Sequence, residues 1–80
     1  RISMNKILFF AHLRDEAGHE SVEIEAAGKT VGELKEMVAE KYSVQKLDTS
    51  MTAINEEFSS NDEVIKEGDT IAFIPPVSGG

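Results

Sequence analysis

The chain ends in Gly79-Gly80, and these two residues offer chemistry that needs no reactive side chain. Because glycine has no side chain, such a tail could thread a narrow channel in another protein and present an unhindered carboxylate. An isolated Gly-Gly ending is more often a loose terminus or a linker. Here Pro75-Pro76 precede it. Because proline has no backbone N–H, they end a strand abruptly, and because its ring fixes φ, they also stiffen the exit of the chain. We therefore expect the carboxylate of Gly80 to be the reactive group, used as an acyl or sulfur donor after another enzyme activates it.

The four residues after Pro76 form the expected exposed tail, Val77-Ser78-Gly79-Gly80. At ~3.4 Å per residue this tail could project about 14 Å from the body of the protein. At the other end, Arg1-Ile2-Ser3 precede Met4 and are interpreted as a cloning remnant. The expected organisation is thus a remnant at 1–3, one domain over 4–76 and a tail at 77–80.

The charge and the missing cysteines disfavour several classes of function. Asp and Glu number 15 against 8 Lys and Arg, a formal net charge of −7. Phosphate backbones and anionic membranes repel such a chain, so we expect no nucleic acid and no membrane partner, but a protein with a basic face. Without cysteine, the chain can hold no disulfide, thiolate metal site or persulfide of its own. The apolar runs are too short to span a membrane, and we expect a cytoplasmic location.

The remaining polar groups are interpreted as solvated surface. His12 and His19 flank a polar segment, but no spacing typical of a metal site surrounds them, and we expect no metal. The further ligands that such a site would need could come only from Asp15, Glu16 and Glu20. The adjacent carboxylates of Glu56-Glu57 do not face each other, which argues against paired acid–base catalysis. By itself the chain is not expected to be a complete enzyme.

Short alternating or apolar runs predict the strands. Residues 6–10 are bulky and apolar, and we expect them to be buried on both faces. Residues 21–26 alternate, with Val22 and Ile24 pointing inward, and form a hairpin with the first strand. Two further strands are predicted at 51–55 and 70–74. Polar loop or irregular chain is expected at 12–18, 43–50 and 56–62.

One helix is predicted at 30–42. Thr30 and Glu33 form a capping box, and apolar residues follow at helical spacing. The charged residues expected on its outer face are Glu33, Lys35, Glu36 and Glu40. A turn at Gly68 launches the last strand. The order strand, strand, helix, strand, strand predicts an α+β fold in which one main helix packs on one face of a mixed sheet.

Three segments carry a family resemblance over residues 4–80. Residues 68–80 resemble the C-terminal signature of the small subunits of molybdopterin synthase, a family of ubiquitin-like sulfur carriers. Residues 7–15, Ile-Leu-Phe-Phe-Ala-His-Leu-Arg-Asp, are similar to that family's first strand and following loop. Ala53-Ile54-Asn55 matches its middle strand. The resemblance implies a ubiquitin-like β-grasp fold.

The resemblance also implies a sulfur-transfer cycle. An E1-like adenylating enzyme would use ATP to form a glycyl adenylate at Gly80, and a sulfur donor would convert this to a thiocarboxylate (1-thioglycine). No cofactor would be bound to the chain itself. The tail would then enter the large subunit, which assembles with the small one as a 2+2 heterotetramer. There it would deliver sulfur to cyclic pyranopterin monophosphate, building the dithiolene of molybdopterin.

Because two glycines supply little binding energy, the partner must also bind the domain. We expect an apolar patch near the tail with a charged rim. The residues expected to bind the partner are Phe10, Arg14, Phe73, Ile74, Pro75 and Pro76, while Val77, Ser78 and Gly79 would thread its active site. Core packing of Phe10 and Phe73 stays open as the alternative, since alternate residues of a strand face inward.

Three other functions stay open at this point. The chain could carry sulfur for the thiazole of thiamine, although that family is usually shorter and is not associated with the Pro-Pro-Val stretch. It could be a ubiquitin-like modifier that conjugates to lysines through Gly80. It could also be a binding module whose tail is inert.

Overall fold

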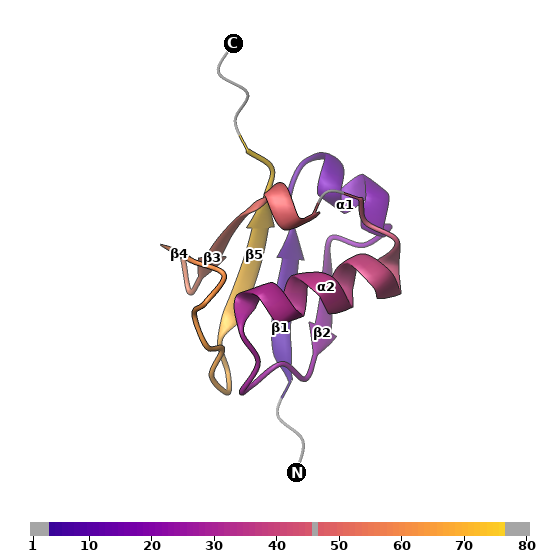
Figure 1. The fold of residues 1–80 in the computed structure, drawn as a ribbon. Helices are drawn as coiled ribbons and strands as arrows, with labels where there is room; N and C mark the ends of the chain where they lie inside the picture. The colour runs from indigo at the N-terminus through magenta and orange to yellow at the C-terminus, as the bar shows by residue number, and fades with distance from the viewer. Residues whose placement is uncertain (1–3, 46, 77–80) are drawn as a thin grey trace.

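The fold is built on a mixed sheet, seen in a computed structural model that describes residues 4–45 and 47–76. Within those residues the sheet has five strands in the order β2-β1-β5-β3-β4 (Figure 1). The elements in chain order are β1 (Asn5–Phe9), α1 (His12–Ala17), β2 (Ser21–Ile24), α2 (Val31–Tyr42), the short 3-10 helix η1 (Leu47–Thr49), β3 (Met51–Ile54), β4 (Glu57–Ser59) and β5 (Thr70–Ile74).

The last strand lies at the centre of the sheet. β5 pairs in parallel with β1, in the register Ile7↔Ile71 and Phe9↔Phe73. On its other side it pairs antiparallel with β3, which pairs antiparallel with β4. The predicted antiparallel pairing of β1 with β2 is confirmed. A chain that leaves the end of β5 therefore leaves from the most constrained strand of the sheet.

Helix α2 crosses one face of the sheet (Figure 1) and begins where the sequence predicts. The Thr30 hydroxyl accepts a hydrogen bond from the backbone N–H of Glu33, and the Glu33 carboxylate accepts one from the N–H of Thr30, so the capping box is confirmed. The prediction that Lys35 lies on the outer face is wrong. Its side chain is buried, because its ammonium reaches under the helix to donate to the Ser50 carbonyl at 3.0 Å.

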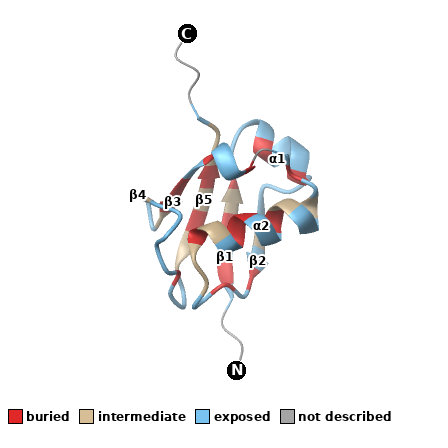
Figure 2. Ribbon diagram, in the orientation of Figure 1, coloured by how far each residue is buried: buried red, intermediate tan, exposed pale blue. Residues whose placement is uncertain are grey.

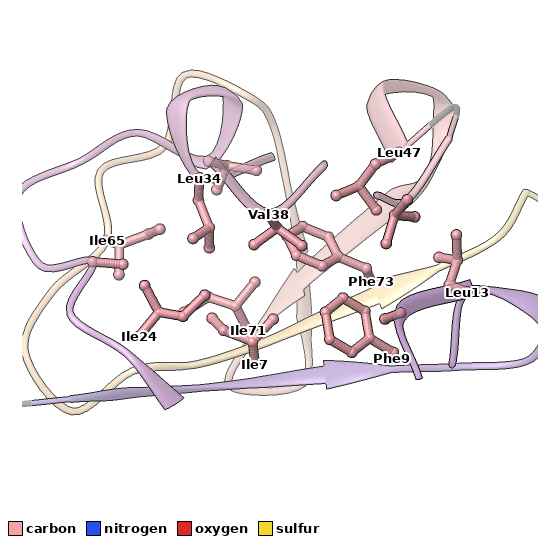
Figure 3. Packing of buried hydrophobic residues seen from close by; sticks show 14 residues of the cluster. Ile7, Phe9, Leu13, Ile24, Leu34, Val38, Leu47, Ile65, Ile71 and Phe73 are labelled. Carbon is pink, nitrogen blue, oxygen red and sulfur yellow. The ribbon is translucent and has the colours of Figure 1, made fainter. Parts of the chain in front are cut away.

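The core fills the space between α2 and the sheet (Figures 2 and 3). Leu34 and Val38 of the helix face the sheet residues Ile7, Ile71 and Phe73. The Phe9 and Phe73 rings, on neighbouring parallel strands, have centroids 6.2 Å apart. The other buried apolar residues of the cluster include Leu13, Ile24, Val31, Leu47 and Ile65. Phe73 is thus a core residue, and its expected place on an exposed patch is wrong.

Three sequence predictions about local structure fail. The segment after β1 forms the helix α1 rather than the predicted loop. Burial of Leu13 and Ala17, one helical turn apart, anchors this helix, and Gly18 ends it in a left-handed conformation. Strand β4 lies in a segment expected to be irregular. Burial of β1 on both faces is also wrong, since Lys6 is exposed and Leu8 is only half-buried.

Asn5 connects three segments at the end of the sheet opposite Ile74, the last residue of β5. Its side-chain nitrogen donates to the carbonyls of Lys66 (2.9 Å) and Asp69 (3.0 Å), and its side-chain oxygen accepts from the N–H of Ala26 (3.0 Å). A buried amide is stable only when such bonds are made. Asn5 therefore fixes the turn that launches β5 against the chain that enters α2.

No helix in the described part of the chain is long and apolar enough to cross a membrane.

Candidate functional site

The expected tail is rooted in the central strand. Ile74, the last residue of β5, pairs with Met51 of β3. On the other side, the backbone N–H of Phe10 donates to the carbonyl of Phe73 at 3.2 Å. Pro75 is half-buried and Pro76 is exposed. The tail residues Val77, Ser78, Gly79 and Gly80 lie outside the described residues. The chain therefore reaches them from a strand that is held on both sides, without a linker.

The face of the sheet turned away from α2 carries an apolar surface. Strand register places Leu8, Ala72 and Ala53 side by side across β1, β5 and β3, and Phe58 of β4 lies opposite Ala53. These residues line a shallow hollow of about 510 Å³, which we call the docking face. Its full lining is Leu8, Phe10, Ala53, Asn55, Glu56, Phe58, Thr70, Ala72 and Ile74.

Two phenylalanines make the docking face unusual for a surface. Phe10 is 46% exposed and Phe58 is 69% exposed, and a phenylalanine ring has a large apolar area that a partner could bury. Exposed apolar side chains that surround a hollow are typical of a binding surface. The docking face begins at Ile74, directly before Pro75. A partner that covers it would therefore lie next to the point where the chain leaves the sheet.

The structure brings together only part of the predicted partner surface. Phe10 and Ile74 lie on the docking face as expected. Phe73 faces the core instead, because the alternation of β5 turns it to the α2 side. Arg14 is exposed on α1, with Nη1 3.9 Å from a carboxylate oxygen of Glu20, and it does not line the hollow.

Sequence reasoning missed most of the docking face. Ala53 and Ala72 have small side chains, and Leu8 is predicted to lie in the interior. Phe58 lies in a strand that the sequence does not predict. The sequence holds a signal for this face in the alternation of the strands, because Leu8 and Phe10 are two residues apart and therefore point to the same side of the sheet. It could be read only once the register between β1, β5 and β3 was known.

The remaining polar candidates show no arrangement for catalysis. Across residues 4–45 and 47–76, no three or more His, Asp or Glu side chains gather where they could hold a metal ion. His12 Nε2 lies 3.9 Å from Glu16 Oε2, and the His19 ring packs on Tyr42 at 5.6 Å between centroids. The adjacent carboxylates of Glu56-Glu57 are exposed.

Several solved structures share the fold, and two of them are compared in detail. SAMP1 (small archaeal modifier protein 1) from Haloferax volcanii superposes with a TM-score of 0.82, at 25% identity, over 96% of this chain and 99% of that one. Subunit 1 in a complex of subunits 1 and 2 of the molybdopterin-converting factor from Helicobacter pylori gives a TM-score of 0.70, at 28% identity, over 96% and 99%. The expected ubiquitin-like β-grasp fold is confirmed.

Sequence comparison gives the family. The molybdopterin synthase sulfur carrier subunit of Escherichia coli is 35% identical over 81 residues, which cover 96% of this chain and 100% of the relative. The ThiS family model matches residues 7–80, from the first strand to the final glycine. Because that match spans nearly the whole chain, the protein belongs to the ThiS family.

Proposed function

We propose that this chain is the sulfur-carrier subunit of a molybdopterin synthase. The observation that carries the proposal is the identity of 35%, over the full length of the relative, with a molybdopterin synthase sulfur carrier subunit. In this role a thiocarboxylate on Gly80 donates sulfur to cyclic pyranopterin monophosphate, and two such deliveries form the dithiolene of molybdopterin. The chain is non-catalytic alone and works as the sulfur-bearing subunit of a complex.

The carrying group follows from the chemistry that the chain lacks. With no cysteine, it cannot hold sulfur as a persulfide, which leaves the terminal carboxylate. A carboxylate is a poor acyl centre, so an adenylating enzyme must first join it to AMP from ATP, releasing pyrophosphate. A sulfur nucleophile then displaces AMP and leaves the thiocarboxylate. Because this activation uses ATP, we also propose a cytoplasmic location.

The docking face suits the large subunit as a partner. Subunit 1 of the Helicobacter pylori factor, which has this fold, was solved in complex with subunit 2. On this chain Phe10 and Phe58 are large, exposed and apolar, as residues that anchor an interface usually are. Ile74 continues the face up to the root of the tail. We therefore propose that the large subunit covers this face while Val77, Ser78 and Gly79 enter its active site, in a 2+2 assembly.

A single-turnover reaction tests the proposal. The full chain is converted to its thiocarboxylate, verified by the mass gained when one oxygen is replaced by sulfur, and mixed with a large subunit and the pterin precursor. We expect dithiolene product from this sample. We expect none from the unmodified chain, nor from a chain without Gly80 carried through the same steps. Circular dichroism of the shortened chain controls for folding.

The outcomes separate the alternatives. No product from verified thiocarboxylate, with a large subunit that is active with its own carrier, would overturn the assignment. A ladder of larger adducts on incubation with the adenylating enzyme and lysine-bearing proteins would instead favour a modifier, the role that the name of the Haloferax volcanii protein indicates. Sulfur transfer to a thiazole precursor would favour the thiamine pathway.

A further inference from the structure

The turn that joins β3 to β4 has an unusual residue at its second position. The two strands meet at the paired residues Ile54 and Glu57, and only Asn55 and Glu56 lie between them. Both turn residues have a positive φ, 52° for Asn55 and 72° for Glu56, as a type I′ turn requires. Asparagine suits the first of these positions. The second normally carries glycine, because the Cβ atom of another residue is crowded there.

The side chain of Glu56 does not compensate for this strain within the free protein. Glu56 is exposed. Among residues 4–45 and 47–76, none forms a hydrogen bond or an ion pair with its carboxylate. A strained backbone that brings no benefit to the fold is typical of a residue whose side chain serves a function.

The Glu56 side chain lines the docking face, and its charge is singular there. Among the described residues that line this face, only Glu56 is charged. Met51 pairs with Ile74 at one end of β3. The turn follows Ile54 at the other end of β3, next to the start of β5. The docking face therefore has the exit of the chain at one end and a free carboxylate at the other.

The turn that carries Glu56 is fixed before any partner binds. The side-chain oxygen of Asn55 accepts a hydrogen bond from the N–H of Thr70 at 3.0 Å, and its side-chain nitrogen donates to the Asp69 carboxylate at 2.9 Å. The backbone N–H of Asn55 donates to the Thr70 carbonyl at 2.8 Å. Because these three bonds hold the turn against the start of β5, its backbone has little conformational freedom to lose on binding.

We propose that Glu56 is a partner-binding residue, and that its carboxylate pairs with an arginine or lysine side chain of the large subunit. The inference rests on the proposal that the large subunit covers the docking face. An apolar surface laid over an unpaired carboxylate would cost free energy of desolvation, which a cation opposite Glu56 offsets. Because this ion pair lies at the end of the face away from Ile74, it also fixes the orientation of the domain on its partner.

Isothermal titration calorimetry of the full-length chain with the large subunit, together with thermal unfolding of the free chain, tests the role of Glu56. Glu56→Gly relieves the strain, so the midpoint of thermal unfolding should rise by about 3–6 °C. Its affinity for the large subunit should fall about three- to tenfold, because the ion pair is lost. Glu56→Gln keeps the size of the side chain and should lose a similar factor in affinity. A residue with a purely structural role would not give these opposite effects on stability and affinity.

Glu57→Gln is the matched control for the change in net charge. Glu57 is also exposed and acidic, but it lines a different hollow and not the docking face, so its replacement should leave the affinity unchanged. The affinity lost in Glu56→Gln should shrink as sodium chloride is raised from about 0.05 M to 1 M, because salt screens the ion pair. Equal losses in Glu56→Gln and Glu57→Gln would show a general attraction between the subunits and would overturn the inference.

Phe10→Ala in the same titrations separates this inference from the proposed function. If Phe10→Ala weakens binding while both Glu56 variants bind as tightly as the original chain, the large subunit covers the docking face without contacting Glu56. The inference is then overturned and the docking proposal stands. If none of the three variants weakens binding, the large subunit does not cover this face, and both proposals about it fail.

Discussion

The backbone N–H of Phe10 donates to the backbone carbonyl of Phe73, at 3.2 Å, and the two side chains lie on opposite sides of the sheet. Phe73 packs in the core, whereas Phe10 is exposed on the docking face. One hydrogen bond thus joins the end of the first strand to the last strand just before Pro75. This bond therefore lies where the core, the proposed partner surface and the exit of the chain toward Pro75 meet.

The first prediction concerns Phe10 on the docking face. Phe10→Ala should weaken binding of the large subunit by about 1–2 kcal/mol, the cost typical of truncating an aromatic anchor. The free energy of unfolding of the Phe10→Ala chain should fall by less than this binding loss, because nearly half of the Phe10 side chain is already exposed to water. Isothermal titration calorimetry measures the affinity, and urea unfolding measures the stability.

Met37→Ala is the matched control for Phe10→Ala. Met37 is a large apolar residue, 36% exposed, but it lies on α2, on the other side of the sheet. Its truncation should leave the affinity unchanged. Equal affinities for Phe10→Ala and the original chain would place the interface elsewhere.

The second prediction concerns Asn5. Asn5→Ala should lower the free energy of unfolding by about 2–3 kcal/mol, because it removes three hydrogen bonds and leaves the buried N–H of Ala26 without a partner. For a domain of this size that is a large part of the total stability. Asp69→Ala is a useful comparison, since the Asp69 carboxylate accepts hydrogen bonds from the Asn55 side chain and the N–H of Lys66, but both bonds are exposed. If Asn5→Ala costs no more than Asp69→Ala, burial of the Asn5 network does not matter.

Local signals in the sequence were sufficient for α2 and for the last strand. The capping box of Thr30 and Glu33 involves only neighbouring residues, so it could be identified without any tertiary information. Gly68 has a φ of 84°, as a turn before β5 requires, and β5 has the predicted bounds Thr70–Ile74. Alternation within that strand does not tell which of its two faces lies against α2. The core face depends on the register with the neighbouring strands, and for this reason Phe73 was assigned to the partner surface rather than to the core.

The elements that were missed depend on contacts or on unusual turn residues. α1 has six residues, too few to form alone, and it is held by the burial of Leu13 and Ala17. β4 follows β3 through Asn55 and Glu56, with φ angles of 52° and 72°. Such a two-residue turn normally carries Asn-Gly, and glutamate at its second position concealed the hairpin. The proposed reactivity of Gly80 could be predicted from the sequence alone, because it requires only a main-chain carboxylate.

The third prediction concerns the backbone of Ala11, between the docking face and α1. Ala11 has φ 54° and ψ −134°, a conformation of type II′ turns that favours glycine. The N–H of Leu13 closes this turn on the carbonyl of Phe10. Ala11→Gly should therefore raise the free energy of unfolding by about 0.5–1 kcal/mol, after the added entropy of the unfolded chain is subtracted. Thermal and urea unfolding measure the change.

Ala27→Gly gives the opposite sign. Ala27 is exposed and does not have a positive φ, so glycine there only adds freedom to the unfolded chain and should cost about 0.4–1 kcal/mol. Destabilisation of similar size in both variants would mean that Ala11 is not strained.

The last prediction concerns Lys35 and pH. Burial lowers its pKa below the ordinary value of 10.5, with Asp48 opposing the shift. Between the folded pKa and that value, the unfolded chain binds more protons than the folded one, so stability increases with pH across this window. Below the folded pKa the penalty for burying the charge is present in full. The stability of the original chain relative to Lys35→Met should therefore rise as the pH is raised from neutral toward 10.5.

Urea unfolding of both chains at a series of pH values gives this difference in stability directly, since the contributions of titrating groups common to both chains cancel. Lys41→Met, on the exposed side of the same helix, controls for removing a lysine from an acidic protein. A difference between the original chain and Lys35→Met that stays flat or falls as the pH rises would show that the folded protein does not disfavour the charged ammonium.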